Sequence, residues 1–118
     1  MIVAGFGFRR AASADSLRDA LAQTGHRPDA LATLADKADG LAPLASAMAL
    51  QVIAVSDAAA QSQKPETTSQ ASQLAKGLDS VAEATALAAA GPGAQLICRR
   101  RISTDRMATC AIAKGTDT

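Results

Sequence analysis

The segment MIVAGFGFRRAASADSL, residues 1–17, decides the fold because it holds the start of one strand and of one helix. Residues 2–4 form a short apolar run, which is typical of a buried strand. Two glycines directly after this run predict a turn at residues 5–7. Ser13 is a good helix N-cap, and Asp15 falls in the first turn, where the helix dipole favours a carboxylate. We therefore predict a strand, a glycine turn and a helix in that order.

The predicted turn is also a candidate site for binding an anion. Gly5 and Gly7 leave backbone N–H groups available, and Ser13 opens a helix N-terminus. Arg9 and Arg10 add two guanidinium groups, a combination that suits phosphate or carboxylate. A dinucleotide fingerprint needs a third glycine near position 10, where Arg10 stands instead, so we reject NAD as a ligand. A tight turn with solvent-exposed arginines explains the same residues equally well.

Beyond this segment, short apolar runs alternate with stretches whose apolar residues recur at helical spacing. We predict strands over residues 30–34, 51–55, 95–98 and 107–112, and helices over residues 14–24, 41–48 and 80–90 with a short alanine helix after residue 57. The alternation indicates a parallel sheet with crossover helices, and the short last link indicates an antiparallel pair. The fold class is α/β: a single three-layer domain, residues 1–118, with a mostly parallel sheet of about five strands and an antiparallel C-terminal edge.

Three other polar stretches are interpreted as a helix cap, part of a strand and a loop. Residues 80–83, SVAE, match a capping box, which explains Glu83. A run of three arginines lies in a predicted strand, whose alternation places Arg99 and Arg101 on one face, so at most part of the run serves one site. Residues 61–73 are polar without apolar periodicity, and we expect a loop that could cover a ligand as a lid.

Composition and charge exclude several classes of protein. The chain has 118 residues, 48% of them hydrophobic, which suits one domain with its own core. A net charge of +1 excludes a basic nucleic-acid-binding protein. Cys98 and Cys110 are too few for a disulfide framework or a zinc site, so we expect buried, reduced thiols and no metal. No apolar run reaches the roughly 20 residues of a membrane span, and no signal peptide is evident. We expect a cytoplasmic protein that begins at Met1 and contacts no membrane.

The loop after the second predicted strand offers further candidates. Ligands of such sheets bind beyond the carboxyl ends of the strands, where Asp36 and Lys37 follow residues 30–34. Lys37 can pair with a substrate carboxylate, and Asp36 can orient the substrate or take a proton, which makes both candidates for catalysis. A solvated pair of loop charges is the simpler interpretation. No Ser-His-Asp, Cys-His or P-loop arrangement is present in the sequence.

Four blocks of the sequence, in order, resemble the cobalamin-biosynthesis family formed by CobE and the C-terminal domain of CbiG. The blocks are AGFGFRRAASADSL, LATLADKADGLAPLASAMAL, DSVAEATALAAAGPGAQL and MATCAIAKG, which begin at residues 4, 31, 79 and 107. The family's first loop often reads Gly-x-Gly-Cys-Arg-x-Gly, whereas this chain has Phe8 at the Cys position and Ala11 at the last Gly. Lys37 matches the family's basic residue, although the loop around it is shorter here.

This resemblance implies a domain of vitamin B12 synthesis whose ligand is a corrin-ring (precorrin) intermediate with several carboxylates. CbiG is associated with opening the ring lactone of cobalt-precorrin-5A and removing a two-carbon fragment. Other enzymes of the pathway are then potential partners. We expect no cofactor.

Three hypotheses remain open at this point. The chain is an enzyme with a hydrolytic or ring-opening role on a corrinoid, a non-catalytic corrinoid carrier of the aerobic pathway, or a generic anion- or nucleotide-binding α/β domain. The sequence leaves the oligomeric state open.

Overall fold

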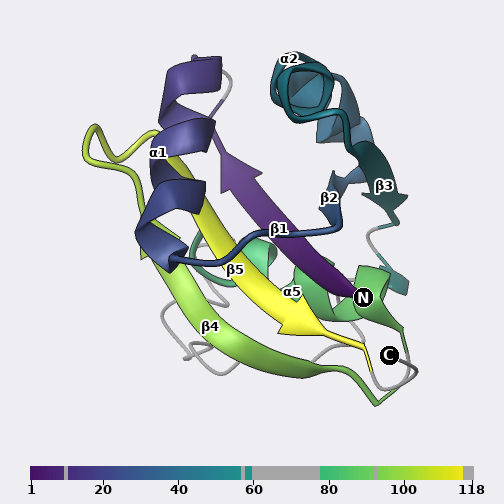
Figure 1. Cartoon of the computed structure of the whole chain (residues 1–118). Helices are drawn as coiled ribbons and strands as arrows, with labels where there is room; N and C mark the ends of the chain where they lie inside the picture. The colour runs from purple at the N-terminus through teal and green to yellow at the C-terminus, as the bar shows by residue number, and fades with distance from the viewer. Residues whose placement is uncertain (10, 57, 60–77, 92, 116–118) are drawn as a thin grey trace.

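The computed structural model describes all residues except 10, 57, 60–77, 92 and 116–118 (Figure 1). Its centre is one five-stranded sheet in the order β3-β2-β1-β5-β4. The strands are β1 (Ile2–Phe8), β2 (Ala30–Leu34), β3 (Gln51–Val55), β4 (Gln95–Ile102) and β5 (Ala108–Lys114). β1, β2 and β3 are mutually parallel, and β5 is antiparallel to both β1 and β4. β4 therefore points the same way as β1, and among the described strands only β5 runs in the opposite direction.

Helices cover both faces of the sheet, which gives three layers (Figure 1). α1 (Ala14–Thr24) and α2 (Ala38–Met48) lie on one face, and α5 (Leu78–Ala90) lies on the other. A short 3-10 turn, η1 (Ala35–Lys37), joins β2 to α2. The α/β class, the mostly parallel sheet and the antiparallel pairing at the C-terminal edge are confirmed.

β1 divides its side chains between the two cores. Phe6 and Phe8 are buried against leucines of α1 and α2, while Val3 packs on the α5 side. Gly5 also faces α5, and a Cβ atom built on it would lie 2.1 Å from the carbonyl oxygen of Ala82. A strand glycine of this kind marks a close approach of another backbone. α5 therefore lies directly on the middle of β1.

The predicted turn at residues 5–7 is wrong, because β1 continues through both glycines to Phe8. Gly5 and Gly7 are buried inside the sheet. The pattern of two closely spaced glycines looks the same whether the chain turns or a helix packs on a strand. Here Gly5 allows the backbone of α5 to pack closely on β1.

Two helix starts also differ from the prediction. α2 begins at Ala38, three residues before the predicted start, and Pro43 lies inside the helix rather than in its first turn. α5 begins at Leu78, so Ser80 is within the helix and the predicted capping box is wrong. Glu83 is instead fully buried, and its carboxylate accepts a hydrogen bond from the Arg100 backbone N–H at 3.1 Å.

β4 departs from regular alternation. Cys98 pairs with Ile112 and Arg101 pairs with Cys110, so β4 advances three residues while β5 advances two. The extra residue is a bulge, which moves Arg101 to the same face of the sheet as Cys98. The predicted placement of Arg99 and Arg101 on one face assumed a strand without a bulge and is wrong. The predicted lid, residues 61–73, lies outside the described residues.

Candidate functional site

The candidate site lies at the edge of the sheet where β1, β2, β3 and β4 all end. The chain leaves β1 toward β2 and β3 on one side, and later returns across the other face to β5 and β4. β1 is therefore the point where the strand order reverses. Ligands of open α/β sheets bind beyond the carboxyl ends of the strands at such a point. Arg9, Lys37, the start of α1 and the turn between β4 and β5 meet there.

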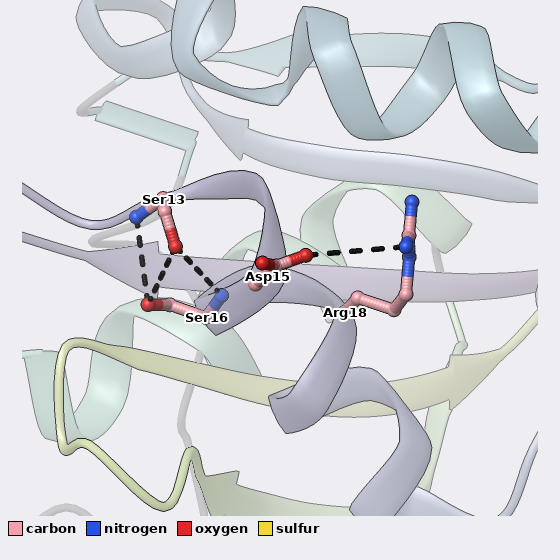
Figure 2. Close-up of polar contacts among 4 residues, drawn as sticks. All are labelled: Ser13, Asp15, Ser16 and Arg18. Atoms are coloured by element: carbon pink, nitrogen blue, oxygen red, sulfur yellow. Dashed lines mark hydrogen bonds and ion pairs between the residues drawn. The ribbon is translucent and has the colours of Figure 1, made fainter.

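Ser13 and Ser16 fix the start of α1 (Figure 2). The Ser16 backbone N–H donates to the Ser13 hydroxyl at 3.2 Å, and the Ser13 N–H lies 3.4 Å from the Ser16 hydroxyl. This reciprocal contact is a capping box made by two serines. Ser13 is thus the predicted N-cap, and its hydroxyl is already engaged within the helix start. Asp15 and Arg18 form an exposed ion pair at 4.0 Å on the same turn.

The start of α1 also contacts the carboxylate of Asp105, a residue between β4 and β5. Asp105, in the turn formed by residues 103–107, accepts hydrogen bonds from the Ser16 and Ser103 hydroxyls and, at 3.0 Å, from the Met107 N–H. These donors, Ser103 first, lower the pKa of Asp105 below its ordinary value. The β4–β5 turn, residues 103–107, is therefore anchored to the first turn of α1.

A second carboxylate anchors the same turn from the side of α1. Asp19 accepts a hydrogen bond from the Thr104 backbone N–H at 2.6 Å, and this bond lowers the pKa of Asp19. A hydrogen bond donated to a carboxylate stabilises its ionised form and therefore lowers its pKa. Both anchors link residues more than 80 positions apart in the chain.

Lys37 is held at the end of β1. Its ammonium group donates to the Phe8 carbonyl oxygen at 3.3 Å and lies 5.5 Å from the centre of the Phe8 ring. A lysine in this position gains from the negative face of the ring as well as from the hydrogen bond. The Phe8 ring packs on Gly40, where an added Cβ atom would lie 2.5 Å from the ring. Phe8 thus supports Lys37 and closes the core beneath it.

Arg9 lies next to Phe8 and is exposed. Its backbone N–H donates to the Met107 carbonyl oxygen at 2.9 Å, which joins it to the β4–β5 turn. We call Arg9 and Lys37 the cationic rim, because Arg9 directly follows β1 and Lys37 lies in η1, which follows the neighbouring strand β2. Asp36 is exposed beside Lys37.

The structure therefore brings together only part of the predicted site. Arg9 and Lys37 meet at the end of β1, with Ser13 at the nearby start of α1. Gly5 and Gly7 lie inside the sheet, and the Gly7 carbonyl accepts a hydrogen bond from the Thr109 hydroxyl at 3.2 Å. Arg10 lies outside the described residues.

Residues of the β4–β5 turn were missed by the sequence analysis. In the sequence, residues 103–107 are only a short connection between two strands and carry no motif that indicates function. The antiparallel pairing of β1 with β5 brings this turn beside Arg9.

The acidic, histidine and cysteine side chains bear on metal and thiol chemistry. In the described part of the chain, no three His, Cys, Asp or Glu side chains are grouped so that they could hold a metal ion. Cys98 and Cys110 are buried and free, as expected, and burial raises the pKa of the Cys110 thiol. Among the described helices, none is long and apolar enough to cross a membrane.

The fold and its edge define an α/β domain whose candidate site lies at the strand-order switch point. Residues 2–113 match the family described as Cobalamin synthesis G C-terminus, so the chain belongs to this family of cobalamin biosynthesis proteins. The resemblance found in the sequence is confirmed.

Solved structures agree with this assignment. CobE, from the cobalamin (vitamin B12) biosynthetic pathway, is 34% identical with a TM-score of 0.78, over 96% of this chain and 89% of that one. The cobalamin biosynthesis protein chiG from Agrobacterium tumefaciens is 32% identical with a TM-score of 0.74, over 99% and 100%. A cobalamin biosynthesis protein G homolog from Sulfolobus solfataricus shares the fold at 21% identity and a TM-score of 0.73, over 95% of this chain and 36% of that longer one. No curated protein sequence matches the chain significantly.

Proposed function

We propose that this protein binds a corrin-ring (precorrin) intermediate through the carboxylates on the edge of the ring. The observation that supports this most is the position of the cationic rim at the strand-order switch of a cobalamin-biosynthesis domain. Corrin precursors carry acetate and propionate groups around a broad ring. Several separated cations orient such a ligand better than one deep pocket does.

The two members of the rim supply different contacts. The guanidinium group of Arg9 can form a bidentate pair with one carboxylate, while Lys37 offers a compact positive charge. Lys37 is already ordered by the Phe8 carbonyl and ring, so less side-chain entropy is lost when a ligand binds. We include Arg10 in the proposed site on its sequence position alone. Gly5 and Gly7 are not included, because both are buried within β1.

A ring-opening reaction is the second candidate function. Asp36 is exposed and directly precedes Lys37 at the same edge of the sheet. A carboxylate there could take a proton from water or substrate while the rim holds the carboxylates of the ring. Without such a reaction, the protein is a carrier that passes an unstable intermediate between enzymes of the pathway.

Titration of the purified protein with hydrogenobyrinic acid and with precorrin mixtures tests both functions. We expect binding with a change in the corrinoid absorbance, and about tenfold weaker binding for Arg9→Ala and for Lys37→Ala. Arg27→Ala is the matched control, because Arg27 is exposed just before β2, at the opposite edge of the sheet.

Mass spectrometry of the bound corrinoid then separates a carrier from an enzyme. An unchanged mass supports the carrier, while a hydrolysed product that disappears with Asp36→Asn supports the enzyme. Equal affinity of the wild type, Arg9→Ala and Lys37→Ala would show that the rim is not the binding site.

A further inference from the structure

Arg106 has an unusual backbone conformation. Its φ angle is +61°, in the left-handed region that favours glycine. Among the described residues the other non-glycine with positive φ is Ala49, which is the C-cap of α2, where this conformation is common. Arg106 lies at no helix end. An arginine therefore occupies a strained turn position where glycine would fit without strain.

The turn around Arg106 is fixed from several directions. The Arg106 N–H donates to the Ser103 carbonyl oxygen at 2.8 Å, and the preceding residue, Asp105, is anchored to Ser16 of α1. Thr104 is anchored to Asp19. Strained conformations persist where the surroundings over-determine them, and they cluster at binding sites. The network holds the backbone while leaving the Arg106 side chain exposed.

The charge of Arg106 has no partner in the described part of the chain. Asp105 directs its carboxylate to hydroxyl and N–H donors, and no described carboxylate forms an ion pair with Arg106 or with Arg9. The turn also joins the end of β1, because the Arg9 N–H donates to the Met107 carbonyl oxygen. Arg106 thus adds a third cation to the surroundings of Arg9 and Lys37, on the β5 side of β1.

We infer that Arg106 is a further carboxylate-binding residue of this site, set in position by the turn anchored on α1. The inference rests on the proposed function, because it assigns to Arg106 a carboxylate of the same corrin ligand. Lys37 lies toward β2 and Arg106 lies toward β5, so together they extend the positive edge across the switch point. A wide ring with carboxylates on several sides matches this arrangement better than a single phosphate does.

Arg106→Gly is the informative variant, because glycine fits the left-handed conformation. We expect the melting temperature to stay the same or to rise, since backbone strain is relieved. The affinity for hydrogenobyrinic acid should fall about tenfold or more, the loss expected for one charge-assisted contact. Arg106→Lys should lose less than Arg106→Gln, because lysine keeps the charge. Arg27→Ala again serves as the control for removing one exposed arginine.

The outcomes separate this inference from the proposed function. Unchanged affinity of Arg106→Gly and Arg106→Gln, together with weaker binding by Arg9→Ala, overturns the role of Arg106 and leaves the rim intact. Unchanged affinity in these three variants and in Lys37→Ala overturns the site as a whole. A fall in melting temperature for both Arg106→Gly and Arg106→Gln, with affinity of the folded protein unchanged, assigns Arg106 a structural role instead.

Discussion

Gly5 lies in the middle of β1, directly beneath α5. A Cβ atom there would lie 2.1 Å from the Ala82 carbonyl oxygen and 2.5 Å from the Ala86 nitrogen. Both atoms belong to the helix backbone, so α5 itself would have to move. We predict that Gly5→Ala lowers the free energy of unfolding by about 3 kcal/mol, at the upper end for overpacking. Urea denaturation followed by circular dichroism measures this loss.

Gly25→Ala is the control for Gly5→Ala. Gly25 is the C-cap of α1 with φ +70°, and no atom lies within 4 Å of an added Cβ. Its substitution should cost only about 1 kcal/mol of conformational strain. A loss for Gly5→Ala no larger than this would show that α5 does not pack on β1 as described.

Glu83 satisfies a backbone group that the bulge in β4 makes available. Its fully buried carboxylate accepts the Arg100 N–H at 3.1 Å. Glu83→Ala would leave this donor without its acceptor and would open a space under β4, so we predict a loss of about 3 kcal/mol of stability. Glu83→Gln keeps an acceptor oxygen and should lose clearly less. Equal losses for the two variants, measured by urea denaturation, would contradict this role.

At the scale of single residues, the sequence predicted a role that depends on neighbouring residues better than roles that depend on distant ones. Ser13 was correctly predicted as the N-cap, since the preference of serine for that position is local. Glu83 was assigned to a capping box because SVAE fits that pattern, whereas its actual partner is 17 residues away. Arg106 gave no signal, since nothing in the sequence shows that position 106 adopts a positive φ.

Among the elements, the contact between α1 and the β4–β5 turn depends on two carboxylates, Asp19 and Asp105. Both have pKa values lowered in the folded protein by hydrogen bonds. A lowered pKa contributes stability that is present above the unfolded value, about 3.9, and is lost as the pH falls through the folded value. We therefore predict that the free energy of unfolding decreases below about pH 4 as this contact is lost.

Asp105→Asn tests this prediction, because asparagine does not titrate in that range. The variant should be less stable than the wild type at pH 6, and the difference should shrink as the pH is lowered to 3. Ser103→Ala removes the first donor to Asp105 and should change the pH dependence in the same direction. Parallel stability curves of the wild type and Asp105→Asn between pH 6 and 3, from urea denaturation, would exclude a contribution from Asp105.

The order of the elements and the bounds of β2 and β3 could be predicted from the sequence, while the end of β1 and the starts of α2 and α5 could not. Apolar periodicity identifies the strands and helices that surround the core. The predicted first strand stopped at residue 4, since glycine reads as a turn signal when the helix packed on it is not known. The bulge in β4 was equally hidden, because it is defined by pairing with β5 and by Glu83 rather than by the residues of β4.

For the whole molecule, the sheet order gathers the exposed cations Arg9 and Arg106, together with the half-buried Lys37, at one edge. The net charge of +1 does not reveal this grouping, because it is only the difference between 12 basic and 11 acidic side chains in the whole chain. The sequence could indicate that Arg9 and Lys37 follow neighbouring strands. It could not show that β5 returns between β1 and β4 and places a third cation beside them. Long-range pairing therefore completes the candidate site.

A ligand that binds only the folded protein must raise its thermal stability. At a corrinoid concentration 100 times the dissociation constant, the free energy of unfolding rises by about 2.7 kcal/mol. For a chain of this size, that corresponds to a rise in melting temperature of roughly 10 °C. We predict such a rise with hydrogenobyrinic acid, measured by differential scanning calorimetry. The double variant Arg9→Ala/Lys37→Ala should show little of it at the same concentration.

The dependence on ionic strength shows whether the ring carboxylates cause the rise in melting temperature. Raising the salt concentration from 0.05 to 0.5 M shortens the Debye length to about 4 Å, which weakens attraction between exposed charges. The rise in melting temperature should therefore shrink in high salt, and it should be small for a corrinoid whose carboxylates have been converted to amides. A rise that is equal for the acid and the amide, at both salt concentrations, would mean that the ring binds through apolar contact and that the cationic edge has another role.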